Sequence, residues 1–486
     1  MEPRVAIVHY HLQTGGVTRV IQHAVHALSA RGVRPVVLAG SRPEHPWPCP
    51  VQVVPALQYE EVRPATTPKA LLDDLRAAAR EALGGAPDLW HVHNHSLGKN
   101  LVFPVALRML AQDGERILLQ VHDLAEDGRP ALYRRMLDTL GEGRIDRLAS
   151  VLYPDAPQVH FAVLNRRELQ AFAAAGVPTG RNHLLPNAVD LDMEGNLPAR
   201  AAPASQAPLW LYPTRAIRRK NLGEFLLWAS ITPEARFGTT RGPANPAEWP
   251  RYQEWRRFAA ELRLPVSFEL GEQPGATLAG LLAACHATVT TSVAEGFGLA
   301  FLEPWLALRP VAGRDLPELT DDFRAEGVRL DGLYRRLDVP LAWLDRDALR
   351  AAAGTALTRL HEAYARPLPP DAVDRALAAW IRDGHVDFGR LDEPLQRAVI
   401  RRVHGATDER SALHPGTLGA GMPTGAVVAA NRQRIRHNFG LKTYGERLLR
   451  CYRALLDAPV APPRPLDGEA LLDHYLAPER LYLLRT

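Results

Sequence analysis

Two glutamates bracket a glycine-containing loop in the stretch Glu295 to Glu303, which reads EGFGLAFLE. The run before it, Ala287 to Thr291, is short and β-branched, which is typical of a buried parallel strand. Apolar residues then recur at helical spacing, so the sequence predicts a strand, a sharp turn at Gly296 and Gly298, and a helix. The two carboxylates and the N–H groups of the helix start could hold an elongated, hydroxyl-rich ligand. The helix dipole by itself also favours a glutamate in the first turn. Whether these glutamates bind a ligand must therefore be judged from other segments of the chain.

A second set of candidate functional residues is a cluster of cations after the predicted strand Leu209 to Tyr212, where Arg215 and Lys220 flank one loop. Of 58 lysines and arginines only four are lysine, so the ammonium next to Arg218 and Arg219 suggests a specific role. Two cations at one strand end would stabilise a departing diphosphate without a metal ion. The alternative is an ordinary surface lysine.

Histidines gather at predicted strand ends in the first half of the chain. His91, His93 and His95 alternate along one strand and its tip, so they would share a face, as metal ligands do. No cysteine or carboxylate completes a ligand set, and polar histidines are common at strand tips, so we expect no metal there. His122 follows another strand, and we prefer a catalytic or sugar-contacting role for it. A hydrogen-bonded structural histidine is the alternative.

The elements that must position these groups alternate between strands and helices. The strand Val5 to Tyr10, a loop with Gly15 and Gly16, the helix Val17 to Arg31 and the strand Val36 to Ala39 predict a parallel βαβ unit. The loop lacks the GxGxxG fingerprint, and no acidic residue follows at the ribose position, which disfavours hydride transfer. The same alternation restarts in the second half of the chain, so we predict an α/β protein with two parallel sheets.

Composition and spacing divide the 486 residues into several parts. A Pro/Ala-rich segment separates the two alternating halves and reads as a linker, and a later region contains helices with few strand candidates. The predicted boundaries are 1–196 for an N-terminal Rossmann-like domain, 197–208 for the linker, 209–348 for a C-terminal Rossmann-like domain, 349–435 for a helical insertion, and 436–486 for C-terminal helices.

The overall composition excludes several classes of protein. The net charge of +4 is small and dispersed, so nucleic-acid binding is not expected. There is no apolar run long enough for a membrane span, and the first residues lead directly into a strand, which predicts a cytoplasmic protein without a signal peptide. Cys49, Cys285 and Cys451 lie far apart, which argues against disulfides and zinc.

Taken together, these segments resemble the retaining GT-B glycosyltransferases of family 4, except over 349–435 and the end of the chain. The resemblance implies two Rossmann-like, doubly wound parallel-sheet domains, the first for an acceptor and the second holding most of a nucleotide-sugar donor in the cleft between them. The matching pieces, in that family's order, are Gly15-Gly16, His122, the turn at Asn187, Arg215 with Lys220, and Glu295 with Glu303.

The resemblance also implies roles for individual residues. Glu303 would bind the ribose hydroxyls, Arg215 and Lys220 the diphosphate, and Glu295 the hexose, with His122 near the sugar's reactive face. The implied catalytic residues are His122, Arg215, Lys220 and Glu295, and the implied donor-binding residues are Gly15, Gly16, Asn187, Arg215, Lys220, Glu295, Gly296, Phe297, Gly298, Leu299 and Glu303.

The activity so implied is transfer of a hexose from a nucleotide-diphosphate sugar to an acceptor hydroxyl with retention, without metal or cofactor. UDP-glucose is the first expectation for the donor and GDP-mannose the next. The acceptor is a small molecule, a glycan or a lipid-linked sugar, and the composition allows a homo-oligomer and peripheral membrane contact. The alternatives are a glycosidase using the two glutamates, a catalytically silent sugar-nucleotide-binding or scaffold subunit, and a sugar-nucleotide epimerase.

Four positions depart from that family's usual pattern. Ala188 replaces the glycine of an Asn-Gly turn, and Thr214 replaces a glycine before the arginine. Pro304 follows the second glutamate, where it would kink a helix unless it lies in the first turn. Leu308 occupies a place usually held by glycine. These departures leave the identity of the donor open.

Overall fold

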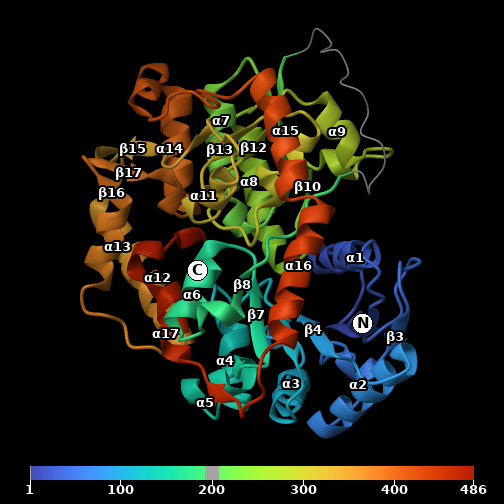
Figure 1. Ribbon diagram of the computed structural model, residues 1–486. Coiled ribbons are helices and arrows are strands. Elements are labelled where there is room, and N and C mark those ends of the chain that lie inside the picture. The colour runs from blue at the N-terminus through green and yellow to red at the C-terminus, as the bar shows by residue number, and fades with distance from the viewer. Residues whose placement is uncertain (1, 192–206, 486) are drawn as a thin grey trace. The chain divides into compact units, whose positions relative to one another are not determined.

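The computed structural model describes residues 2–191 and 207–485 of the chain (Figure 1). They form two compact units. Most of the predicted linker, 197–208, lies outside the described residues. Unit 1 comprises Met1–Ala188, Ala363–Arg366 and Asn438–Leu476, and unit 2 comprises Val189–Glu362, Pro367–His437 and Ala477–Thr486.

Unit 1 is built on a seven-stranded sheet with the order β3-β2-β1-β4-β5-β7-β8. All neighbouring strands in it are parallel. Its strands are short, and the central ones are buried throughout, as expected for a sheet with helices on both faces. The strands are β1 (Val5–His9), β2 (Val36–Ala39), β3 (Val51–Val53), β4 (Leu89–His93), β5 (Ile117–Gln120), β7 (Val159–Val163) and β8 (Asn182–Leu184).

The helices of unit 1 carry the sequence signals of their ends. The Asn165 side chain caps helix α6 by accepting a hydrogen bond from the Glu168 N–H at 2.9 Å, and the Glu168 side chain accepts from the N–H of Leu164, the residue before the cap. Helix α16 packs against β5 and β7, far from them in sequence (Figure 1). The helices are α1 (Gly16–Ser29), α2 (Pro68–Leu83), α3 (Val102–Gln112), α4 (Pro130–Thr139), α5 (Ile145–Leu152), α6 (Arg166–Ala174), α16 (Leu441–Leu456) and α17 (Gly468–Leu476), and β6 (Pro154–Asp155) pairs with β18 (Arg464–Pro465).

Unit 2 contains a six-stranded sheet with the order β11-β10-β9-β12-β13-β14, also parallel throughout. Counted from its first strand this is the order 3-2-1-4-5-6, the Rossmann order. The strands are β9 (Leu209–Arg215), β10 (Arg236–Arg241), β11 (Val266–Ser267), β12 (Ala287–Thr290), β13 (Val311–Arg314) and β14 (Leu333–Tyr334).

Helices and a small antiparallel sheet complete unit 2, with α7, α8 and α11 beside the large sheet (Figure 1). Helix α7 is buried on every side, which explains its almost wholly apolar sequence. The helices are α7 (Leu222–Ile231), α8 (Trp249–Glu261), α9 (Leu278–Ala284), α10 (Glu303–Leu306), α11 (Pro317–Ala325), α12 (Arg346–Ala363), α13 (Ala372–Trp380), α14 (Glu393–Gly405) and α15 (Ala426–Asn438), and the small sheet has the order β15 (Asp338–Pro340), β17 (His385–Asp387), β16 (Ile381–Arg382).

The compact units group the chain differently from the predicted parts. The region predicted as a helical insertion, 349–435, shares one hydrophobic core with the sheet of unit 2, where Trp380 and Val399 belong to the same cluster as Phe225. Of the predicted C-terminal helices, residues 438–476 belong to unit 1, because α16 completes its core. No helix within the described residues is long and apolar enough to cross a membrane.

Candidate functional site

The strand order in the sheet of unit 2 reverses between β9 and β12, which lie side by side with Ala287 paired to Trp210 and Thr288 to Leu211. In an open α/β sheet, the loops that leave two such neighbouring strands run in opposite directions and open a crevice at the carboxyl edge. The loop after β9 carries the predicted cations, and the loop after β12 carries Glu295. Topology alone therefore brings these two segments to one place.

An ion pair joins the two loops. The Lys220 Nζ donates a short hydrogen bond to Glu295 Oε1, and Arg219 Nη1 lies 3.4 Å from Glu295 Oε2. Arg219 Nη1 also donates to the Ala294 carbonyl at 2.7 Å, and Val293 N–H donates to the Arg219 carbonyl at 3.0 Å. Lys220 and Glu295, predicted from sequence to act together, are thus in direct contact.

The pair is shielded from water, with side-chain exposures of 15% for Lys220 and 9% for Glu295. Burial lowers the pKa of the Lys220 ammonium, while Glu295 opposes this change and Arg219 adds to it. Burial would raise the pKa of Glu295, but Lys220, Arg219 and two hydrogen bonds outweigh it and hold that pKa below its usual value. The carboxylate is therefore ionised at neutral pH.

Buried hydroxyls hold both partners in place. The Tyr212 hydroxyl donates to the Lys220 carbonyl at 3.0 Å, and the Thr291 hydroxyl donates to the same carbonyl at 3.1 Å. Ser292 Oγ donates to Glu295 Oε1 at 2.6 Å and lies 2.9 Å from the Tyr212 hydroxyl. The ammonium has three N–H donors, and only one is needed for Glu295. The others can meet an anionic ligand.

Glycine is required where the loops turn. Gly298 has φ +89°, and a Cβ there would lie 2.9 Å from the Phe301 ring. A Cβ at Gly313, the third residue of β13, would lie 2.1 Å from the Thr290 carbonyl oxygen of β12. The backbones at this sheet edge therefore approach more closely than any side chain allows.

The second glutamate, Glu303, is the first residue of a short helix. Residues Leu299–Phe301 form a 3₁₀ turn, and α10 then begins at Glu303. Pro304 lies in the first turn of α10, where its missing N–H disrupts no hydrogen bond. Leu308 has φ +55°, a left-handed conformation that glycine adopts without strain. The departures at Pro304 and Leu308 are thus accommodated without changing the fold.

Arg215 and Arg219 differ from the sequence expectation. Arg215 is the last residue of β9 and exposed, and among the described residues the cations beside Glu295 are Lys220 and Arg219. The sequence reasoning missed Arg219 because three consecutive cations give no sign of which one faces the site. The role predicted for Arg215 stays a prediction.

The predicted residues Gly15, Gly16, His122 and Asn187 belong to unit 1. Gly15 caps the start of α1, and a Cβ added at Gly16 would meet nothing within 4 Å, so this loop leaves open space. His122 Nε2 shares a hydrogen bond of 2.9 Å with His93 Nδ1, and the two rings stack. Burial lowers the pKa of His122 to about 3, so its imidazole is neutral.

The three alternating histidines do not converge on one point. His91 bonds to Tyr452 at 2.8 Å and to Gln120 at 2.9 Å, and His95 Nε2 bonds to the Leu152 carbonyl at 2.6 Å. His93, as above, pairs with His122. Within the residues that the structure describes, no group of three or more histidines, cysteines or carboxylates is arranged to hold a metal ion.

A buried carboxyl group in unit 1 gives a pH-dependent prediction. Glu126 accepts hydrogen bonds from the Tyr153 hydroxyl at 3.1 and 3.2 Å, and burial raises its pKa to about 7. The folded state therefore keeps a proton that the unfolded chain releases near pH 4.3. Between these values the free energy of unfolding should fall as pH rises, by up to about 1.4 kcal/mol per pH unit. Denaturant titrations of Glu126→Gln should show a shallower fall than wild type.

Glu168 has the same raised pKa, about 7, and accounts for the slope that should remain in that variant. The exposed Glu61 offers a matched control, since Glu61→Gln should leave the wild-type slope unchanged. Equal slopes for wild type and Glu126→Gln would contradict the assignment.

Two Rossmann-like units, the second with a lysine, an arginine and a glutamate at its switch point, give the chain the fold of the GT-B glycosyltransferases. Residues 14–193 match the family model Glycosyltransferase Family 4. The predicted α/β GT-B fold is therefore confirmed, and the match over residues 14–193 supports the predicted family.

Similarity to individual proteins is distant. The chain is 23% identical over 350 residues to mannosylglucosyl-3-phosphoglycerate synthase of Petrotoga mobilis, over 65% of this chain and 66% of that protein. Its fold is similar to sucrose-phosphate synthase of Thermosynechococcus elongatus, with a TM-score of 0.54, 17% identity, and 93% and 98% of the two chains covered. The Anabaena protein HepE, solved with UDP and glucose, gives a TM-score of 0.52 with 14% identity, covering 93% of this chain and 100% of that one.

Proposed function

We propose that the chain transfers a hexose from a nucleoside-diphosphate sugar to an acceptor hydroxyl with retention of configuration. The observation that carries the proposal is the buried contact of Lys220 with Glu295 at the switch point of unit 2, with Arg219 beside it. Lys220 and Arg219 supply positive charge where a diphosphate would depart, and fixed charges in a shielded site are more effective than in water.

In the proposed reaction the bond between the sugar's anomeric carbon and the diphosphate oxygen breaks. A bond forms from the acceptor oxygen to that carbon on the same face, and the departing diphosphate oxygen takes the hydroxyl proton. Lys220 and Arg219 balance the charge that develops on the diphosphate, so the proposal requires no metal ion. Glu295 would orient the hexose, and Glu303 would accept hydrogen bonds from the ribose hydroxyls.

The state of Glu295 argues against its use as the acid of a glycosidase. A glycosidase acid needs a raised pKa so that it carries a proton to the leaving group. The pKa of Glu295 is instead lowered, and both its oxygens already face donors from Lys220, Arg219 and Ser292. Glu295 therefore suits a hydrogen-bond acceptor better than a proton donor.

The first test is binding of nucleotides by thermal unfolding. HepE was solved with UDP and glucose, so UDP and UDP-glucose are tested first. GDP-mannose is next, because the relative in Petrotoga mobilis is named for a mannosylglucosyl product. A ligand at a hundredfold excess over its Kd should stabilise the protein by about 2.7 kcal/mol. NMR of the glycoside product would then show whether configuration is retained.

ADP and ADP-glucose complete the series and show whether binding depends on the nucleobase. A protein whose unfolding responds to none of the three nucleotide classes would contradict donor binding and favour the scaffold alternative. Hydrolysis of aryl glycosides in the absence of nucleotide would favour the glycosidase.

A further inference from the structure

Side chains from the first turn of α14 contact the turn that carries Lys220. Arg218 and Asn221, three residues apart, flank Lys220, and Glu393 and Gln396, three residues apart on α14, face them. Arg218 Nε and Nη2 donate to the two oxygens of Glu393 at 2.7 and 2.9 Å. Gln396 Nε2 donates to Asn221 Oδ1 at 2.9 Å. Helix α14 therefore holds the turn on both sides of the lysine.

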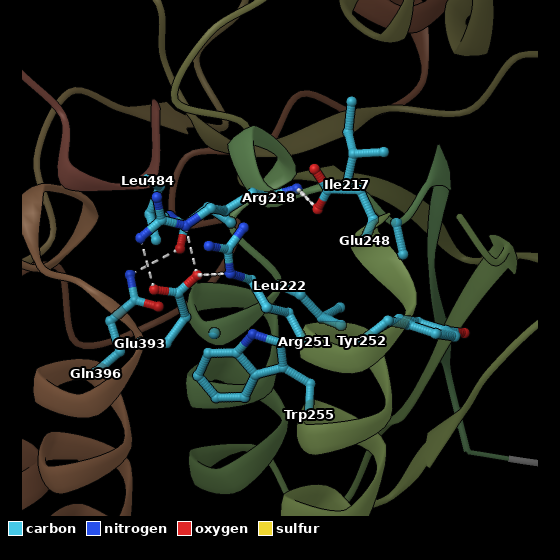
Figure 2. A pocket seen from close by; sticks show the side chains of 13 residues that line it. Ile217, Arg218, Leu222, Glu248, Arg251, Tyr252, Trp255, Glu393, Gln396 and Leu484 are labelled. Atoms are coloured by element: carbon cyan, nitrogen blue, oxygen red, sulfur yellow. Dashed lines mark hydrogen bonds and ion pairs between the residues drawn. The ribbon is translucent and has the colours of Figure 1, made fainter. Parts of the chain in front are cut away.

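Both contacts have the geometry of strong interactions. The Arg218–Glu393 pair is bidentate and largely buried, with exposures of 16% and 12%, so solvent screens it little. Figure 2 shows the guanidinium of Arg218 and the carboxylate of Glu393 facing each other beside a pocket whose wall includes Arg251 and Trp255. Gln396 and Asn221 are buried almost completely. A lost contact here would leave a buried polar group unpaired.

Asn221 needs this support because of its backbone. It has φ 52° and ψ 58°, a left-handed conformation that costs free energy for a residue other than glycine. Its Nδ2 donates to Glu224 Oε2 at 2.8 Å, and its Oδ1 accepts from Gln396. Side chains from α7 and α14 thus fix the backbone immediately after Lys220.

We propose that Glu393 and Gln396 are positioning residues of the donor site, which hold the turn so that the Lys220 ammonium faces Glu295. This inference rests on the proposed function and assigns a role to the 349–435 region, which the sequence left without one. Neither residue touches the donor in this proposal. Each acts through the turn.

The test compares binding of a nucleoside diphosphate with binding of the matching nucleoside by titration calorimetry. Glu393→Gln removes the negative charge that Arg218 faces, and Gln396→Met removes the hydrogen bond to Asn221 at nearly constant volume. Each variant should bind UDP, or whichever diphosphate the wild type binds, roughly tenfold more weakly, because Lys220 loses its alignment with the phosphates. Uridine, which carries no phosphate, should bind with unchanged affinity.

Matched controls separate positioning from general stability. Arg401 and Glu261 form an exposed ion pair between α14 and α8 at 3.1 Å, away from the turn, so Glu261→Gln should bind UDP like wild type. Exchanging the charges in Arg218→Glu with Glu393→Arg should recover most of the affinity that Glu393→Arg alone loses.

Two results would overturn the inference. Unchanged diphosphate affinity in both Glu393→Gln and Gln396→Met would show that α14 does not position Lys220. Parallel losses of diphosphate and nucleoside affinity would show a structural role only. A wild-type protein that binds no nucleoside diphosphate would instead overturn the proposed function, and this inference with it.

Discussion

Lys220→Ala is expected to lower kcat/KM for the nucleotide-sugar donor by at least about 100-fold while unit 2 stays folded. The variant removes the cation in direct contact with Glu295 at the switch point. A hydrogen bond to a charged group contributes about 1.5–3 kcal/mol, and a preorganised donor to a developing charge contributes somewhat more. The loss should therefore appear in kcat as well as in KM. Steady-state assays with varied donor, together with thermal unfolding, measure it.

Two further variants make the result specific. Arg219 lies at 3.4 Å from Glu295 and is 39% exposed, so solvent weakens its interaction, and Arg219→Ala should cost roughly tenfold or less. Lys69 is an exposed lysine of unit 1 paired with Asp73, so Lys69→Ala should leave activity unchanged. Activity of Lys220→Ala within roughly threefold of wild type would refute the assigned role.

The sequence singled out Lys220 and Glu295 because each follows a predicted strand, and the signal of such a strand is local. Short buried strands such as Val5–His9 and Val36–Ala39 carry their signal in a few consecutive residues. Loops after neighbouring parallel strands must then meet at one edge. The resemblance to family 4 assigned these two residues, which are 75 positions apart, to one site, and in the structure their side chains are in contact.

The direction of the three adjacent cations could not be read from the sequence. Arg218 turns away from the site because Glu393, 175 residues further along the chain, accepts its guanidinium. Arg219 turns toward it because the Ala294 carbonyl and Glu295 lie there. The direction of each side chain depends on its tertiary partners, and hydrophobic periodicity and helix or strand propensity carry no information about those partners.

The two units could not be delimited from sequence for the same reason. Helix α16 has an ordinary amphipathic pattern, and nothing in it indicates that Tyr444 and Leu448 complete the core of unit 1. Likewise Glu224, Arg314 and Asp387 are scattered charges in the sequence. In the structure they form one buried cluster.

Arg314→Met is expected to destabilise unit 2 by about 3–5 kcal/mol. Arg314 is completely buried and donates to Glu224 at 2.6 Å and to Asp387 at 2.8 Å, both of them also buried. Without the guanidinium, two carboxylates remain in the interior without a counter-charge, and the desolvation cost of each is no longer offset. Urea denaturation gives the total change, and hydrogen exchange of β13 and β17 peptides assigns it to unit 2.

The origin of this loss can be separated from the loss of packing. Arg335→Met changes a neighbouring arginine that is 70% exposed, and should shift stability by less than about 0.5 kcal/mol. Adding Glu224→Gln and Asp387→Asn to Arg314→Met removes the two buried carboxylate charges that have lost their cation. The triple variant should therefore recover part of the stability that the single variant loses. A triple variant less stable than Arg314→Met would show that the hydrogen bonds of the two carboxylates, rather than their uncompensated charge, dominate the cluster.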